Sequence, residues 1–148
     1  MPDILHRIAA INTTREKLYE ALTTTAGLAA WWTEDTSGVG YAVGGLLKFR
    51  FPGGGFDMKV SLLQENQEVV WEVVAGEMEW IGTTISWNLK SVESATVVLF
   101  KQANWKEATE FMHHCSTKWA IFLMSLKAYM ETGKGAPSPN DLKIDDWN

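Results

Sequence analysis

Residues 104–132 read NWKEATEFMHHCSTKWAIFLMSLKAYMET, and this stretch predicts one long helix. Apolar side chains recur along it every three or four residues and form a single stripe, as expected of a helix that packs against a core: Met112, Cys115, Trp119, Phe122, Leu126 and Met130. Asn104 and Glu107 have the spacing of an N-terminal cap, and Gly133 follows as a stop signal. About 25 residues at 1.5 Å each give roughly 35–40 Å, enough to cross a small domain.

The middle of the chain has the alternation of β-strands. Residues 46–51 and 56–62 alternate apolar with polar side chains, and Pro52-Gly53-Gly54-Gly55 provides a hairpin turn between them. Three more strands are expected at 69–74, 82–90 and 95–101, each bounded by polar clusters. The sequence therefore predicts an antiparallel meander in front of the long helix.

The N-terminal third predicts one strand and two short helices. Residues 4–11 read as a strand, and Thr13 and Glu16 then have capping-box spacing for a first helix. The triplet 23–25 interrupts that helix and offers a new N-cap for a second one, and a glycine-rich loop at 38–45 follows. The predicted class is α+β, with a curved antiparallel sheet and two short helices wrapped around the long C-terminal helix.

Composition places the chain among globular proteins, because 46% of its residues are hydrophobic and 21% are charged. The 148 residues predict a single domain at 1–133 and a loosely packed tail at 134–148. A net charge of −5 without a Lys/Arg cluster argues against nucleic acid as a partner. No signal peptide or membrane helix is evident, and Cys115 is the only cysteine, so we expect a cytoplasmic protein with no membrane association and no internal disulfide.

Several motifs extend over nearly the whole chain: Ala21-Leu22-Thr23, Trp31-Trp32-Thr33, Gly44-Gly45-Leu46-Leu47-Lys48-Phe49, and residues 119–127 with Glu131-Thr132-Gly133. They resemble bacterial homologues of the activator of the heat-shock protein ninety ATPase, a family of the SRPBCC or START-like superfamily that includes birch-pollen-allergen-like proteins. The resemblance implies a helix-grip fold. Members of the superfamily include apolar-ligand binders, cyclase-like enzymes, stress proteins and a cochaperone domain, so the resemblance names a fold rather than a reaction.

The first functional hypothesis is a domain that binds a small apolar or aromatic ligand in a central cavity. Eight Trp, six Phe and three Tyr supply the apolar area, and strand parity with the helix stripe selects the inward candidates. The predicted ligand-binding residues are Trp31, Trp32, Phe49, Phe51, Met58, Trp71, Ile85, Trp87, Phe111, Cys115, Trp119 and Phe122. A core filled by these same side chains is an equally good interpretation of the pattern.

The second hypothesis is a cyclase- or hydrolase-like enzyme with an acid or base at the cavity mouth. It needs an inward His6, Glu72, Glu77 or Glu79, whereas a solvated outer position is expected for each of them and for Arg7 and Arg50. Glu72 in particular opposes the parity of Trp71 and should face water. The sequence contains no Gly-x-Ser-x-Gly, His-Glu-x-x-His or Walker motif, so we assign no catalytic residue and no cofactor.

His113-His114-Cys115 brings three potential metal ligands together in sequence. Consecutive helical residues point about 100° apart and cannot converge on one ion, so no metal site is predicted. Cys115 lies on the apolar stripe, and a small buried hydrophobe is the better interpretation of it than a nucleophile.

The third hypothesis is a stress-response or cochaperone-type interaction domain that works through its outer surface. Exposed side chains of Trp31, Trp32 or Trp105 would form the apolar patch that such a domain needs. The same patch, or an unpaired sheet edge, would also allow a homodimer, so both monomer and homodimer stay open. Trp147 in the tail is expected to be disordered rather than packed across a neighbouring molecule.

Overall fold

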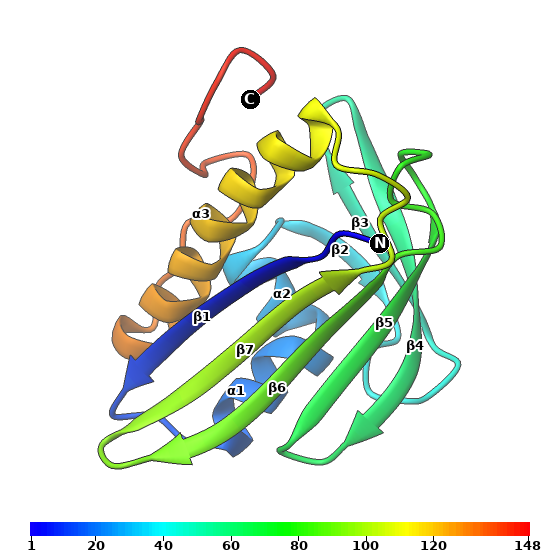
Figure 1. Cartoon of the computed structure of the whole chain (residues 1–148). Helices are drawn as coiled ribbons and strands as arrows, with labels where there is room; N and C mark the ends of the chain where they lie inside the picture. The colour runs from blue at the N-terminus through cyan, green and yellow to red at the C-terminus, as the bar shows by residue number, and fades with distance from the viewer.

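The computed structural model describes all 148 residues and has an α+β fold in which one curved antiparallel sheet holds three helices. The elements are β1 (Ile4–Ile11), α1 (Arg15–Thr23), α2 (Thr25–Trp31), β2 (Asp35–Gly38), β3 (Leu46–Phe51), β4 (Gly54–Gln64), β5 (Glu68–Ala75), β6 (Thr84–Val92), β7 (Ala95–Ala103) and α3 (Glu110–Thr132). The strand order is β1-β7-β6-β5-β4-β3-β2. Figure 1 shows α3 running alongside β1, with α1 and α2 on the concave side of the sheet. The predicted α+β class with a long C-terminal helix is confirmed.

The helices begin where threonine side chains cap them, but not always at the predicted threonine. The hydroxyl of Thr14, not Thr13, accepts a hydrogen bond from the backbone N–H of Lys17. The long helix likewise starts at Glu110 rather than near Asn104, because Thr109 is its N-cap and accepts from Met112 N–H. The predicted boundaries of both helix starts were therefore wrong, whereas the predicted stop of α3 at Thr132 is confirmed.

Two details of the sheet depart from the sequence pattern. Strand β2 was not predicted, because its four residues, Asp-Thr-Ser-Gly, have no apolar alternation. Its strand geometry comes from pairing with β3. In β4 the register with β5 shifts between Val60 and Leu62, which turns Leu62 outward although its parity with Val60 predicted the buried face.

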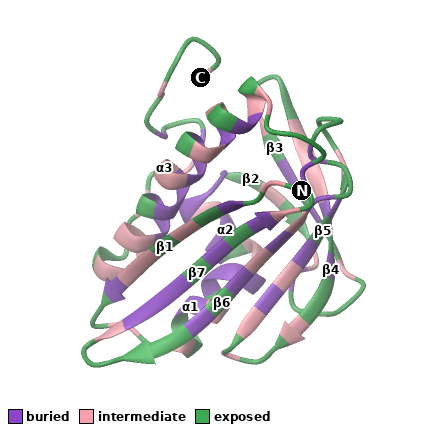
Figure 2. Cartoon of the chain, viewed as in Figure 1, coloured by how far each residue is buried: buried purple, intermediate pink, exposed green.

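The core lies between the concave sheet face and the helices, as the buried residues in Figure 2 indicate. Six fully buried tryptophans dominate it: Trp31, Trp32, Trp71, Trp87, Trp105 and Trp119. The exposed patch that the interaction-domain hypothesis needs is therefore not formed by Trp31, Trp32 or Trp105, because all three side chains are buried.

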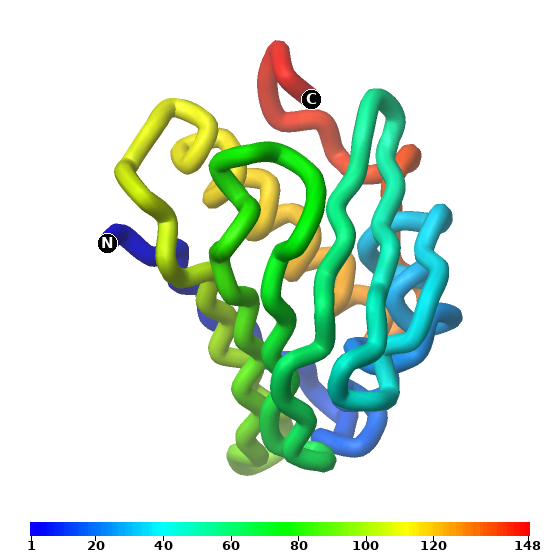
Figure 3. The backbone as a smooth tube through the Cα atoms, turned by 90° about the vertical axis from the view of Figure 1, so that its right-hand side faces the viewer, coloured from blue at the N-terminus to red at the C-terminus, as the bar shows by residue number.

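Residues 134–148 return along α3 toward its N-terminal end, as the red segment shows in Figures 1 and 3. Ser138 accepts from Glu34 N–H and donates its own N–H to the carbonyl of Trp32, which ties the segment to the end of α2. Asp141 is buried against α3. The expected loose packing of this segment is therefore wrong, since its polar groups find partners on the domain. No helix of the chain combines the length and the apolar character needed to cross a membrane.

Candidate ligand-binding site

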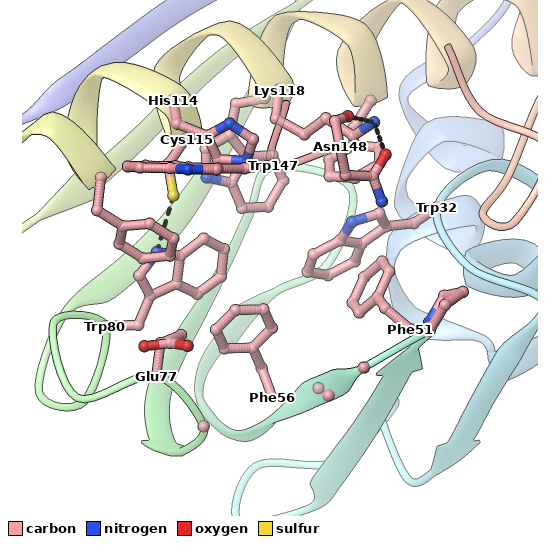
Figure 4. A pocket seen from close by; sticks show the side chains of 18 of the residues that line it. Trp32, Phe51, Phe56, Glu77, Trp80, His114, Cys115, Lys118, Trp147 and Asn148 are labelled. Carbon is pink, nitrogen blue, oxygen red and sulfur yellow. Dashed lines mark hydrogen bonds between the residues drawn. The ribbon is translucent and has the colours of Figure 1, made fainter. Parts of the chain in front are cut away.

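A cavity of about 540 Å³ opens between α3, the β3–β4 hairpin, the loop after β5 and the C-terminal segment (Figure 4). This volume is within the range of small-molecule sites. Aromatic rings from every one of these elements and from the end of α2 line it: Trp32, Phe51, Phe56, Trp80, Phe111, Trp119, Phe122 and Trp147. The cavity therefore offers a large apolar surface with several ring faces for a ligand.

A buried chain of hydrogen bonds fixes two of these rings. Trp119 Nε1 donates to Gln102 Oε1 (2.8 Å), Gln102 Nε2 donates to Thr83 Oγ1 (3.1 Å), and the Thr83 hydroxyl donates to the carbonyl of Trp80 (2.7 Å). Trp80 Nε1 in turn donates to Cys115 Sγ at 3.3 Å. The indoles of Trp80 and Trp119 consequently lie 5.8 Å apart and within 11° of parallel, which makes them a preformed part of the wall.

Two glycines let the opposite wall close on these rings. A Cβ at Gly55 would lie 2.2 Å from the carbonyl oxygen of Phe49, and a Cβ at Gly76, where φ is +128°, would lie 2.6 Å from the ring of Phe56. With glycine at both positions, Phe56 stacks on Trp80 with 3.9 Å between ring centroids. The glycine-rich turn is therefore a packing device, and no helix follows it that could make it a phosphate cradle.

Lys118 and Asp141 form a buried ion pair at the edge of the cavity. Lys118 Nζ lies 2.5 Å from Asp141 Oδ2, and their side chains are 10% and 2% exposed. Lys143 approaches the other carboxylate oxygen at 2.9 Å. Burial alone would raise the pKa of Asp141, but the hydrogen bonds from the two lysines outweigh burial and hold the pKa below its usual range. The pair fastens the C-terminal segment to α3.

A second contact with the C-terminal segment joins His114 to Asp145. His114 Nδ1 and Asp145 Oδ2 are 2.7 Å apart, and the hydrogen bond from His114 lowers the pKa of Asp145. The imidazole also packs with the rings of Phe111 and Trp147, and the three ring centroids are 5.5–6.5 Å apart. A carboxylate that holds an imidazole in one orientation is a common arrangement in acid–base chemistry. Here the hydrogen bond between His114 and Asp145 also attaches the C-terminal segment to α3.

Cys115 lines the cavity as a neutral thiol. Burial, with a smaller contribution from nearby carboxylates, raises its pKa to about 12, although the hydrogen bond from Trp80 acts in the opposite direction. A thiol with this pKa stays protonated at neutral pH and is a poor nucleophile. The chain contains no group of three His, Cys, Asp or Glu side chains that could hold a metal ion.

The structure divides the twelve predicted ligand-binding residues into two equal groups. Those that line the cavity come from α3, from the end of α2 and from the tip of β3: Trp32, Phe51, Phe111, Cys115, Trp119 and Phe122. The others point inward as predicted but lie deeper, where they fill the core: Trp31, Phe49, Met58, Trp71, Ile85 and Trp87. Ligand contact by any of the twelve stays a prediction.

The acid–base candidates are dispersed. Glu72 faces solvent, as its parity predicted, and Glu79 is exposed and accepts from the Thr109 hydroxyl. Only Glu77 lies at the cavity mouth, on the exposed loop after β5. The enzyme hypothesis requires an acid or base that points into the cavity, and a single exposed carboxylate at the mouth gives it little support.

The other charged candidates contribute nothing to the cavity. His6 was expected on a solvated face, but its ring is half-buried beneath α3, 6.1 Å from the ring of Phe100 and 3.0 Å from the carbonyl oxygen of Ser116. Arg7 is exposed as expected, and Arg50 is an exposed partner of Asp57.

Sequence reasoning missed several residues of the cavity: Phe56, Trp80, His114, Lys118, Asp141 and Trp147. Trp80 offered a weak signal, since it is a large aromatic residue in a short polar segment between two strands. Lys118 and Asp141 offered none, because each looks like an ordinary solvated charge until the chain returns along α3.

Comparison with known proteins places this geometry in context. The family profile described as "Activator of Hsp90 ATPase homolog 1-like protein" matches residues 12–131. The solution structure of the Aha1 dimer from Colwellia psychrerythraea matches with 52% sequence identity and a TM-score of 0.83. The match covers 91% of this chain and 100% of that chain. No curated protein matches the sequence.

Two more distant structures share the fold alone. A protein from Staphylococcus saprophyticus is 18% identical over 90% of this chain and 95% of its own, with a TM-score of 0.74. CalU16 from Micromonospora echinospora is 14% identical over 93% of this chain and 77% of its own, with a TM-score of 0.72. The helix-grip arrangement is therefore kept across sequences that have little identity with this one.

Proposed function

The chain belongs to the family of Activator of Hsp90 ATPase homolog 1-like proteins, and from this premise we propose that it binds a small apolar or aromatic molecule in its central cavity. The observation that carries the proposal is the cavity of about 540 Å³ with its wall of aromatic rings. Buried apolar area provides most of the affinity in such sites, and ring faces add preferred stacking positions.

The alternatives have less support. An enzyme would need an acid or base directed at the ligand, and of the four residues considered for that role only the exposed Glu77 reaches the cavity. A cochaperone-type surface was expected to display Trp31, Trp32 and Trp105, which are buried. The cavity remains the feature with the clearest chemical use.

Titration with the neutral fluorescent probe N-phenyl-1-naphthylamine tests the proposal. We expect a saturable rise in probe fluorescence with one probe per chain. Phe56→Ala should weaken binding about tenfold, because it removes an aromatic ring that the probe would contact. Full burial of a phenylalanine side chain contributes on the order of 1.5–3 kcal/mol. Leu62→Ala, on the outer sheet face, is the matched control and should bind as the parent does. Absence of saturable binding in a folded sample would contradict the proposal.

We also propose that the chain forms a homodimer. The Colwellia relative, 52% identical, is described as a dimer. In this chain, Tyr41, Val43 and Leu46 are exposed apolar side chains within six residues, beside the edge strand β2, and a second copy would cover them.

Sedimentation velocity checks the assembly. The expected mass is twice the 16.6 kDa of one chain, and Tyr41→Ser combined with Val43→Ser should shift the equilibrium toward monomer. Met124→Ser, an exposed site on α3, is the control and should leave the mass unchanged. A parent protein that sediments as a monomer at every concentration would rule the dimer out.

A further inference from the structure

The indole N–H of Trp32 is a buried donor without an acceptor. The side chain is fully buried and lines the cavity, and its Nε1 has no hydrogen-bond partner in the protein. Two other cavity indoles, Trp80 and Trp119, are hydrogen-bonded to Cys115 and Gln102. An unsatisfied buried donor is destabilising, and in a native protein it calls for an explanation.

The neighbouring polar groups show what kind of acceptor would fit there. In Figure 4 the Trp32 nitrogen lies on the side of its ring that faces Asn148, whose side-chain oxygen is turned toward Lys118. Lys118 Nζ has four oxygen neighbours in all: Asp141 Oδ2, the carbonyl oxygen of Leu142, and the main-chain and side-chain oxygens of Asn148. Asn148 thus lines the same cavity as the orphaned N–H, but its oxygens accept from Lys118 and from the backbone N–H of Ile144, not from Trp32.

Two ammonium groups meet at this position. Lys118 and Lys143 share the single carboxylate of Asp141. Asp145, the next acidic group along the segment, is engaged by His114, and the charge of Lys118 also lowers its pKa. Within the segment that covers the position, Leu142 is 65% and Trp147 is 49% exposed.

We propose that the ligand of this cavity is a small apolar carboxylic acid whose carboxylate takes the place of Asn148 between Lys118 and Trp32. One carboxylate oxygen would accept from Lys118 Nζ and the other from Trp32 Nε1–H, while the apolar body occupies the aromatic cavity. This inference rests on the proposed function and specifies its ligand class. A carboxylate suits the position because it can accept from both donors at once and forms a charge-assisted hydrogen bond with the ammonium of Lys118.

The test compares 2-naphthoate with 2-methylnaphthalene as competitors of the neutral fluorescent probe. We expect 2-naphthoate to bind at least about tenfold more tightly, since a hydrogen bond to a charged group is stronger than a neutral one. Trp32→Phe removes the N–H and keeps an aromatic ring, so it should abolish most of this preference and leave binding of 2-methylnaphthalene within about threefold. In ¹⁵N–¹H spectra, the indole signal that Trp32→Phe deletes should move downfield on addition of 2-naphthoate only.

Trp71→Phe is the matched control, because the Trp71 indole is also buried and unpaired but does not line the cavity. It should leave the preference for 2-naphthoate unchanged. Equal binding of both naphthalenes, or a preference that survives Trp32→Phe, would overturn the carboxylate inference while leaving the proposed function in place. Failure of both compounds and of the probe itself to bind would overturn the proposed function as well.

Discussion

Trp119→Ala is expected to lower the free energy of unfolding by about 3–5 kcal/mol, the range for removing a large buried aromatic side chain. The ring lies at the centre of the aromatic cluster, with centroids 4.5 Å from Phe100 and 5.0 Å from Trp32. Its loss also removes the donor to Gln102, a fully buried amide. Denaturant titration followed by circular dichroism measures the change, with the slope of the transition showing whether the unfolding remains two-state.

Two matched variants separate the causes of this loss. Trp147→Ala removes a tryptophan that is half exposed, and should cost about 1 kcal/mol or less. Trp119→Phe keeps an aromatic ring but loses the N–H together with part of the volume, so the cost beyond lost volume reports the orphaned oxygen of Gln102, about 1–3 kcal/mol. If Trp119→Ala were no more destabilising than Trp147→Ala, the central place of Trp119 in the core would be wrong.

Asp141→Asn is expected to destabilise the protein by about 2–3 kcal/mol at neutral pH, because it leaves the buried ammonium of Lys118 without its counter-ion. The loss should fall below the 3–5 kcal/mol typical of a broken buried pair, since Lys118 keeps carbonyl and amide oxygens as acceptors. Asp146→Asn is the control, because Asp146 is exposed and has no ion-pair partner. Equal stability of the two variants would contradict the role of the pair.

The pH dependence of the same variant gives an independent check. The pKa of Asp141 is lowered in the folded protein, so this carboxylate contributes stability above its unfolded value of about 3.8, and that contribution is lost as pH falls through the folded pKa. The stability difference between the parent and Asp141→Asn should therefore be constant near neutral pH and shrink at acidic pH, below about 3.8. A difference that does not change with pH would mean that this carboxyl has the same pKa in the folded and unfolded states, which would contradict the lowered folded pKa.

The sequence predicted the framework because periodicity is local. Met112, Cys115, Trp119, Phe122 and Leu126 share one face of a helix wherever the helix lies, and all five are buried in the structure. The same reasoning predicted the inward faces of β3, β5 and β6. Where local signals competed, it failed: Asn104 and Thr109 both offer N-caps, and only the path of the chain after β7 selected Thr109.

The cavity could be predicted only in part. Trp32 and Trp87 were both predicted to point inward and are both buried, but only Trp32 is among the residues that line the cavity. Whether a buried ring faces a cavity or another side chain depends on how volumes from distant segments add up. Phe56, Trp80 and Trp119 meet from β4, the loop after β5 and α3, and no local pattern records that meeting.

The sequence by itself determined the α+β class, the sheet faces, the long helix and the family, because these depend on propensity, period and short motifs that the neighbouring residues encode. Tertiary structure alone decided that the C-terminal segment covers the cavity, that Lys118 is paired with Asp141, and that the Trp32 N–H is unpaired in the wall of that cavity. Those features need groups far apart in the chain to be brought into contact and removed from water together. Their energies therefore arise only when the chain is folded.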